Sequence, residues 1–276
     1  MTASTSPARP RRGVLLDLDG VVYVGHDPVP GAADAIRWLA REGVPYCFLT
    51  NTTSQPRQAI VDTLVGMGVP ARTEQVLTPA VAAVAWLRHH GIDRPAVFVP
   101  AATAAEFAAL QPVAEDVEQG AGAVVIGDLG EGWDFPTLNR ALRLLVSGPT
   151  APLVALGMTR YWQAEDGLRL DAGAFVRALE YAAGRTAVVL GKPDPAFFGA
   201  AVDALGLEAG VGTGQVVMVG DDVRTDVAGA QAAGLTGVLV RTGKFAASDL
   251  DGEVRPDAVL DSLADLPEWW TGAAPG

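Results

Sequence analysis

The sequence predicts a doubly wound α/β fold, a Rossmann-like parallel sheet with helices on both faces and a second, inserted α/β unit. Short apolar runs alternate along the chain with stretches of helical periodicity. The apolar runs show no polar alternation, as expected of strands buried on both faces. Several of them end in polar residues, and ligands bind at such strand ends in open α/β sheets.

The expected strands are short and apolar. They cover residues 14–16, 45–49, 76–77, 96–99, 123–126, 153–156, 187–190, 216–219 and 238–240. The expected helices carry apolar residues at helical spacing, and the first of them stops at Glu42 and Gly43. They cover residues 31–41, 56–67, 80–90, 103–110, 135–146, 173–183 and 197–205, with a last one ending at Ala233. Residues 158–162 are expected to form a loop with exposed aromatic side chains.

The order of these elements predicts one domain interrupted by another. Residues 13–80 and 177–276 are expected to form the core domain, and residues 81–176 an inserted α/β cap. Residues 1–12 are polar and lack an apolar stretch, so we expect a disordered tail and not a signal peptide. No apolar run reaches the roughly 18 residues that span a bilayer.

The amino-acid composition argues against some classes of binding partner. The chain has 276 residues, of which 49% are hydrophobic, and its net charge is −12. This acidic balance argues against nucleic acid and anionic membranes as partners, since both favour cationic surfaces. The single cysteine, Cys47, lies in an apolar run, so we expect a buried, inert thiol. With no disulfide possible within the chain, a reducing, cytoplasmic location is the simplest expectation.

Four strand ends carry residues suited to chemistry, and parallel strands bring such ends to one edge of a sheet. Each residue alone also has an ordinary structural interpretation: a turn, a surface lysine, or a helix N-terminus. Their joint occurrence at four separate strand ends favours a site. The candidates are Asp17, Asp19 and Gly20; Thr50 and Asn51; Lys192; and Asp221, Asp222 and Asp226.

This set of residues suits phosphoryl transfer. Several carboxylates together repel one another and call for a cation, and oxygen ligands of this kind favour Mg²⁺. A carboxylate also serves as a nucleophile that forms an aspartyl-phosphate. A lysine and a threonine hydroxyl hold the charge and the oxygens of the transferring group. The substrate expected from this chemistry is a small phosphorylated molecule.

The same residues resemble the four motifs of the haloacid dehalogenase superfamily, from about Gly13 to Pro267. Their spacing resembles subclass IIA, in which a C2-type α/β cap is inserted between the second and third motifs. Within it, the stretches 50–53, 160–161, 173–182, 229–231 and 239–244 resemble a smaller group. That group contains phospholysine phosphohistidine inorganic pyrophosphate phosphatase and haloacid dehalogenase-like hydrolase domain-containing protein 2.

The resemblance implies a metal site and a nucleophile in the acidic motifs. Asp17 would attack phosphorus. Asp19 would protonate the leaving group and then activate water, while its backbone carbonyl and the carboxylates of Asp17 and Asp221 would bind Mg²⁺. Asp226 would orient Lys192 or metal-bound waters.

The resemblance also implies residues that hold the substrate. Thr50 would bind the phosphoryl group with Asn51 nearby, the backbone at Gly20 would approach it, and Lys192 would steady the nucleophile and the phosphate. Asp222 would support the residues around it.

The cap departs from the broader subclass. Many relatives there carry an Asn-x-Asp-like segment where this chain has residues 157–160, which argues against transferring their sugar-phosphate or nucleotide specificities. Arg160 is the predicted substrate-binding residue of the cap, together with Tyr161 and Trp162. Packing of these aromatics between cap and core is the competing interpretation. A homodimer is a further possibility.

Three other classes of protein compete with a phosphatase. A phospho-accepting receiver domain uses similar residues, but their order along the chain differs and it lacks the insert. A dehalogenase fits the acidic motif less well than a phosphatase does. The third is a catalytically narrow or idle protein that acts as a binding or regulatory module. An idle protein that binds a partner through its cap predicts a broken motif, whereas none is broken here.

Overall fold

The structure is a computed structural model that describes residues 11–164 and 167–272. The chain divides into two compact units, which are described separately below. Unit 1 comprises Met1–Leu49, Val61–Val76 and Ala201–Gly276, and unit 2 comprises Thr50–Ile60 and Leu77–Ala200. The two units are defined by contacts within the chain. The boundaries of the inserted cap at residues 81 and 176 therefore stay a prediction.

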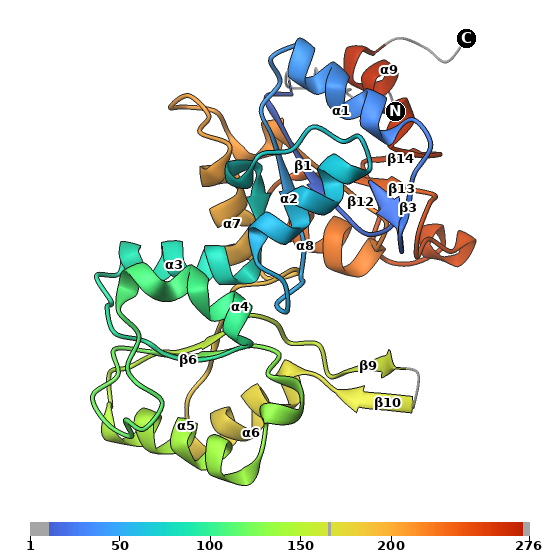
Figure 1. Ribbon diagram of the computed structural model, residues 1–276. Coiled ribbons are helices and arrows are strands. Elements are labelled where there is room, and N and C mark those ends of the chain that lie inside the picture. Colours follow the sequence, from blue (N-terminus) through green and yellow to red (C-terminus); the bar gives the residue numbers. More distant parts are fainter. Residues whose placement is uncertain (1–10, 165–166, 273–276) are drawn as a thin grey trace, which may run out of the picture. The chain divides into compact units, whose positions relative to one another are not determined.

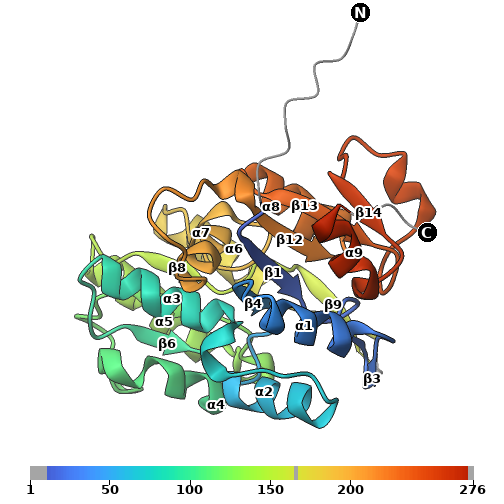
Figure 2. The ribbon, with the colours of Figure 1, turned by 90° about the horizontal axis from the view of Figure 1, so that it is seen from above.

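A six-stranded sheet in the order β14-β13-β12-β1-β4-β5 is built from the described part of the chain (Figures 1 and 2). The pairings of β1 with β12 and β4, of β12 with β13, and of β13 with β14 are parallel. This confirms the predicted doubly wound, Rossmann-like α/β class. The strands are β1 (Gly13–Asp17), β4 (Tyr46–Leu49), β5 (Val76–Leu77), β12 (Val216–Gly220), β13 (Thr236–Val240) and β14 (Ala258–Leu260).

The centre of this sheet is fully apolar. Val14, Leu15 and Leu16 are completely buried, and Leu16 pairs with Val219 on one side and Phe48 on the other. The Cys47 thiol is buried, as predicted. Helices α1 (Ala32–Arg41) and α9 (Leu266–Thr271) pack against each other in unit 1 (Figure 1). Burial of one face of α1 is consistent with its predicted helical spacing.

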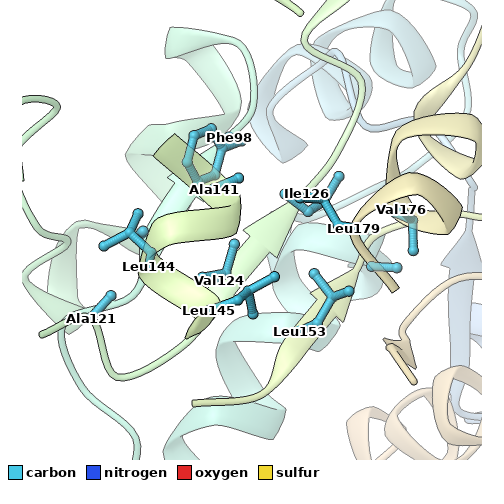
Figure 3. Close-up of a cluster of buried hydrophobic side chains, with 12 residues drawn as sticks. Phe98, Ala121, Val124, Ile126, Ala141, Leu144, Leu145, Leu153, Val176 and Leu179 are labelled. Carbon is cyan, nitrogen blue, oxygen red and sulfur yellow. The ribbon is translucent and has the colours of Figure 1, made fainter. Parts of the chain in front are cut away.

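Unit 2 contains a parallel four-stranded sheet among its described residues, in the order β11-β8-β7-β6. Apolar side chains of this sheet, such as Val124 and Ile126, pack against α5 and α6 to form a separate hydrophobic core (Figure 3). The strands are β6 (Ala96–Phe98), β7 (Val124–Ile126), β8 (Leu153–Ala155) and β11 (Val188–Val189). The helices are α3 (Pro79–His89), α4 (Ala101–Ala104), α5 (Phe135–Ser147) and α6 (Ala172–Ala183). Two further helices, α2 (Arg57–Gly66) and α7 (Pro195–Ala204), run from one unit into the other.

The prediction of a loop over residues 158–162 is partly wrong. Tyr161 and Trp162 lie on β9 (Tyr161–Ala164), which pairs antiparallel with β10 (Gly167–Leu170). Tyr161 is exposed as expected, whereas the side chain of Trp162 lies outside the described part of the structure.

Other differences concern the ends of elements and small additions. The helix expected over 103–110 is a 3₁₀ helix from Ala105 to Leu110, preceded by α4. The turn after β12 is π-helical over Val223–Ala228 and continues into α8 (Gly229–Ala232). The short hairpin of β2 (Tyr23–Val24) and β3 (Asp27–Pro28), together with β14 and α9, had no predicted counterpart.

The predicted tail is only partly described. Residues 1–10 lie outside the described part, but Arg11 donates hydrogen bonds to the carbonyl oxygens of Trp269 and Trp270. The backbone N–H of Arg12 donates to the carbonyl of Gln215. The last two residues of the predicted tail are therefore bound. Of the helices in the described ranges, none has the length and apolar character needed to cross a membrane.

Candidate active site

Three buried carboxylates meet in unit 1. Asp17 ends β1, Asp221 follows β12, and Asp226 lies in the π-helical turn after it. One oxygen from each lies within 4.8 Å of the others, and their residues are 7%, 1% and 0% exposed. The parallel pairing of β1 with β12 causes this convergence, because it sets the carboxyl ends of both strands side by side.

Two glycines allow the backbone to approach Asp221. Gly20 has φ +88° and Gly243 has φ +64°, conformations that L-residues rarely adopt. A Cβ atom on Gly20 would lie 1.9 Å from Asp221 Oδ2, and one on Gly243 would lie 2.1 Å from the same oxygen. The two glycines thus leave the space that this carboxylate occupies.

The loop after β13 completes the surroundings of Asp221. The backbone N–H of Lys244 donates to Asp221 Oδ2 at 2.7 Å, and the hydroxyl of Thr242 donates to the carbonyl oxygen of Gly20. From sequence, this stretch carries a family resemblance but no predicted role. Its position directly after a buried strand was the signal that could have identified it.

Asp222 supports the turn that carries Asp226. Its Oδ1 accepts hydrogen bonds from the N–H groups of Arg224 and Thr225 at 2.9 and 3.1 Å. Burial alone would raise the pKa of Asp222, but these hydrogen bonds and the charge of Lys244 outweigh it and lower the pKa. The N–H of Asp222 in turn donates to Asp226 Oδ2 at 3.2 Å.

Asp19 differs from the buried carboxylates. It is exposed, and its Oδ1 accepts a long hydrogen bond of 3.5 Å from the N–H of Gly25. The neighbouring Tyr23 was not predicted as part of the site. Burial raises the pKa of the Tyr23 hydroxyl, and the negative charges of Asp19 and Asp17 raise it further. An exposed carboxylate is accessible for exchanging protons with substrate and water.

Asn51 and Lys192 are joined in unit 2. The Asn51 side-chain amide donates to the carbonyl oxygen of Lys192 at 2.9 Å, and Asn51 Oδ1 accepts from the N–H of Lys192 at 2.8 Å. Lys192 is 7% exposed. A Cβ atom on Gly191 would lie 2.7 Å from the carbonyl oxygen of Leu156, so only glycine fits beside this pair without movement.

The segment that follows Asn51 is tied to neighbouring elements of unit 2. The buried hydroxyl of Thr103 donates to the carbonyl oxygen of Thr53 at 2.7 Å. Arg57 donates to Glu106 from its backbone N–H and from two guanidinium nitrogens. Within the segment, Thr50 Oγ1 accepts from the N–H of Thr52 at 3.0 Å. Residues 50–57 are therefore fixed at several points.

The predicted site residues fall into two groups. In unit 1, the structure brings together Asp17, Gly20, Asp221, Asp222 and Asp226, with Asp19 exposed beside them. In unit 2 it joins Asn51 to Lys192, with Thr50 next to Asn51 in the chain. Arg160, also in unit 2, is exposed, and its guanidinium carbon lies 5.6 Å from the Tyr161 ring centroid.

The acidic group fits a divalent cation. Its atoms are carboxylate oxygens, which are the ligands that hard cations such as Mg²⁺ and Ca²⁺ take. Buried carboxylates this close together repel one another unless positive charge or protons compensate them. The donor set therefore matches a metal centre with oxygen ligands.

Comparison with known proteins identifies the family. The model of the haloacid dehalogenase-like hydrolases matches residues 14–111, and the HAD-hydrolase-like model matches residues 189–266. Phospholysine phosphohistidine inorganic pyrophosphate phosphatase of Rattus norvegicus is 37% identical over 260 residues, covering 92% of each chain. Haloacid dehalogenase-like hydrolase domain-containing protein 2 of Bos taurus is 38% identical over 247 residues, covering 88% of this chain and 89% of its own.

Solved structures of similar fold were also found. The p-nitrophenyl phosphatase from Archaeoglobus fulgidus superposes with a TM-score of 0.83 at 27% identity, covering 95% of this chain and all of its own. NagD from E. coli K-12 gives a TM-score of 0.81 at 25% identity, covering 93% of this chain and 98% of its own.

The chain belongs to the haloacid dehalogenase-like hydrolase family, as the motifs predicted. Within that family it is a phosphatase, an enzyme that hydrolyses phosphate bonds.

Proposed function

We propose that the chain is a Mg²⁺-dependent phosphatase that hydrolyses small phosphorylated substrates through an aspartyl-phosphate on Asp17. The observation that carries this proposal is the group of three buried carboxylates at the ends of β1 and β12. Asp17 ends the central strand with little exposed surface, in the position of a nucleophile at a strand end.

The metal proposed for this group is Mg²⁺. The carboxylates of Asp17 and Asp221 and the backbone carbonyl of Asp19 would hold it, and Asp226 would orient its bound waters or Lys192. When bound, Mg²⁺ supplies positive charge that offsets these carboxylates and the charge of the transferring phosphoryl group.

The first chemical step forms the intermediate. A carboxylate oxygen of Asp17 attacks phosphorus, and the bond from phosphorus to the leaving oxygen or nitrogen breaks. Asp19 gives its proton to that oxygen or nitrogen, which departs in protonated form. The exposed position of Asp19 suits this role, since it lies beside the buried nucleophile and is accessible.

The second step regenerates the enzyme. Asp19, now ionised, takes a proton from water, and the resulting hydroxide attacks phosphorus. The bond between Asp17 and phosphorus breaks, which releases inorganic phosphate and returns the Asp17 carboxylate. Asp19 again carries a proton, ready for the next cycle.

The residues of unit 2 are proposed to hold the substrate. Thr50 would bind the phosphoryl oxygens through its hydroxyl, and the Lys192 ammonium would offset the charge of the nucleophile and the phosphate. The double hydrogen bond to Asn51 supports this role of Lys192, because it fixes the backbone from which the ammonium extends. Arg160 would contact the substrate from the cap.

The names of two relatives support the proposed substrate class. One of them is named for phospholysine, phosphohistidine and inorganic pyrophosphate, and another for p-nitrophenyl phosphate. We therefore propose a small phosphomonoester, pyrophosphate or a compound with a P–N bond as the substrate of this chain.

An activity assay tests the proposal. Purified protein is given p-nitrophenyl phosphate, pyrophosphate and a phosphoramidate, with Mg²⁺ or with EDTA, beside Asp17→Asn. We expect turnover that requires Mg²⁺ and is lost in the variant. If none of the three is hydrolysed by folded protein, the proposal fails and the predicted alternative, a narrow or idle binding module, is favoured. Turnover that persists in Asp17→Asn would contradict the assigned nucleophile.

A further inference from the structure

Unit 2 contains a cavity of about 300 Å³ beside the Asn51–Lys192 pair. Its walls include residues 51–54, Asp128, Gly157, Thr159 and Asp171. Asn51 lines the cavity and also holds the backbone of Lys192 through two hydrogen bonds. Gly157, another wall residue, directly follows Leu156, whose carbonyl oxygen faces Gly191. The cavity therefore adjoins the residues proposed to hold the phosphoryl group.

The charged groups that line this cavity are all acidic. Asp128 and Asp171 are both partly buried, and none of the described residues that line the cavity is Lys, Arg or His. Burial raises the pKa of Asp171, and the negative charge of Asp128 raises it further. Two carboxylates on the wall of one cavity attract a cation and repel an anion.

The start of helix α6 also lines the cavity but does not offer an anion site. The carboxylate of Asp171 caps this helix, and its Oδ1 accepts the N–H of Ala172 at 2.6 Å. A negative side chain already compensates the partial positive charge of the helix N-terminus. The Asp128 carboxylate accepts the N–H of Gly130 at 2.9 Å, which fixes its position in the wall.

We propose that this cavity receives the leaving group of the substrate, and that Asp128 and Asp171 make the enzyme prefer leaving groups that carry a protonated amine. The inference rests on the proposed phosphatase function and adds the charge of the preferred substrate. A leaving group with a carboxylate or a second phosphate is disfavoured by the same two aspartates.

Three esters of matched size test this preference. O-phosphoethanolamine, ethyl phosphate and phosphoglycolate each have a two-carbon leaving group, which is cationic, neutral and anionic respectively. The value of kcat/KM is measured for each ester with wild type, Asp128→Asn and Asp171→Asn. Asparagine retains the side-chain oxygen that accepts the backbone N–H in both places, so the variants remove charge with little structural change. Asp116→Asn, an exposed acid of unit 2 outside the cavity lining, is the matched control.

We expect wild type to favour phosphoethanolamine over ethyl phosphate, and ethyl phosphate over phosphoglycolate. Each cavity variant lowers the ratio of kcat/KM for the cationic ester to that for the neutral ester by roughly tenfold, as expected for one lost charge-assisted contact. The control leaves the ratio unchanged. Thermal unfolding of each variant verifies that it is folded.

Other outcomes overturn the inference. If the ratio of kcat/KM for the cationic ester to that for the neutral ester is the same in wild type and both cavity variants, the two aspartates do not select the leaving group by its charge. If wild type prefers phosphoglycolate to ethyl phosphate, the cavity favours an anionic leaving group, which contradicts the proposal. p-Nitrophenyl phosphate is assayed in parallel to report the proposed function separately. If it is hydrolysed while phosphoethanolamine is not, the inference alone fails. If none of these esters is hydrolysed, and pyrophosphate and a phosphoramidate are refused too, the proposed function fails as well.

Discussion

Asn51 and Lys192 are 141 residues apart in the chain, and the side chain of the first is doubly hydrogen-bonded to the backbone of the second. The side-chain amide of Asn51 uses both its NH₂ group and its oxygen in these bonds. The backbone of Lys192 is therefore held in both position and direction. Asn51 was predicted to bind substrate. The geometry gives it a positioning contact, through which it acts on the residue proposed to carry the positive charge.

Replacing Asn51 by alanine should therefore damage catalysis more than folding. Two hydrogen bonds are lost, which costs on the order of 1–2 kcal/mol in the free energy of unfolding. Release of the Lys192 backbone lowers kcat by roughly tenfold or more, because small displacements of a catalytic group are costly. Steady-state kinetics and denaturant unfolding measure the two effects. Asn139→Ala, at the other asparagine of the chain, serves as the control, and equal kcat in both variants would contradict the positioning role.

Gly243 should be intolerant of a side chain. Alanine there places Cβ 2.1 Å from Asp221 Oδ2 and 2.4 Å from the Cα atom of Gly20. The expected loss is at least about 2 kcal/mol in the free energy of unfolding, together with most of the phosphatase activity.

Gly43→Ala is the matched control for this substitution. Gly43 has φ +64°, the same as Gly243, but among the described residues outside its chain neighbours no atom lies within 4 Å of the position that a Cβ would take there. It should lose only about 1 kcal/mol from backbone strain and keep its activity. If the two variants lose the same stability and activity, the role of Gly243 is not to allow the backbone to approach Asp221.

The charge of Asp222 should stabilise the fold in a pH-dependent way. Its folded pKa lies below the ordinary 3.8, so folding favours the ionised form. The stabilisation is fully present above the unfolded pKa and is lost as the pH falls through the folded pKa. Asp222→Asn keeps an oxygen for the N–H groups of Arg224 and Thr225, so its cost of about 1 kcal/mol reports the charge.

Urea unfolding of wild type and Asp222→Asn across a pH series measures this difference. We expect a constant gap in stability between about pH 5 and 8, and convergence of the two proteins below about pH 4. A gap that persists unchanged into acid would show that the carboxylate charge contributes nothing.

Thr103 should fix the segment after Asn51. Its hydroxyl is buried and donates to the carbonyl oxygen of Thr53, so Thr103→Val leaves that carbonyl without this donor at nearly constant side-chain shape. The expected cost is about 1–2 kcal/mol in the free energy of unfolding. Thr103→Ser keeps the hydroxyl and should retain more stability than valine. The reverse order, measured by thermal unfolding, would mean that packing of the methyl group dominates.

The parts of the site that follow from sheet geometry were predictable from sequence. β1 is an apolar run that ends in Asp17, and β12 is an apolar run that Asp221 and Asp222 follow directly. Parallel pairing then places Asp17 beside Asp221, because side-by-side strands have their carboxyl ends at one edge. The strand order itself is not visible in local patterns, because β1 pairs with β4, the next strand of this sheet along the chain, and also with β12, which is distant in sequence.

The parts that depend on distant contacts were not predictable. The double hydrogen bond of Asn51 joins residues that are 141 positions apart in the chain, and no local sequence pattern indicates it. The approach of Gly243 to Asp221 depends on how the loop after β13 folds back. The raised pKa of Tyr23 likewise comes from burial and from charges that only the folded chain brings near.

Chemical trapping of the intermediate tests the central claim most directly. The enzyme is mixed with p-nitrophenyl phosphate and Mg²⁺, quenched in acid and treated with borohydride, which reduces an acyl phosphate to an alcohol. Peptide mass spectrometry should then find homoserine in place of Asp17, and none in protein that received EDTA before substrate. Phosphate release by the same protein without homoserine at position 17 would contradict an aspartyl-phosphate on Asp17.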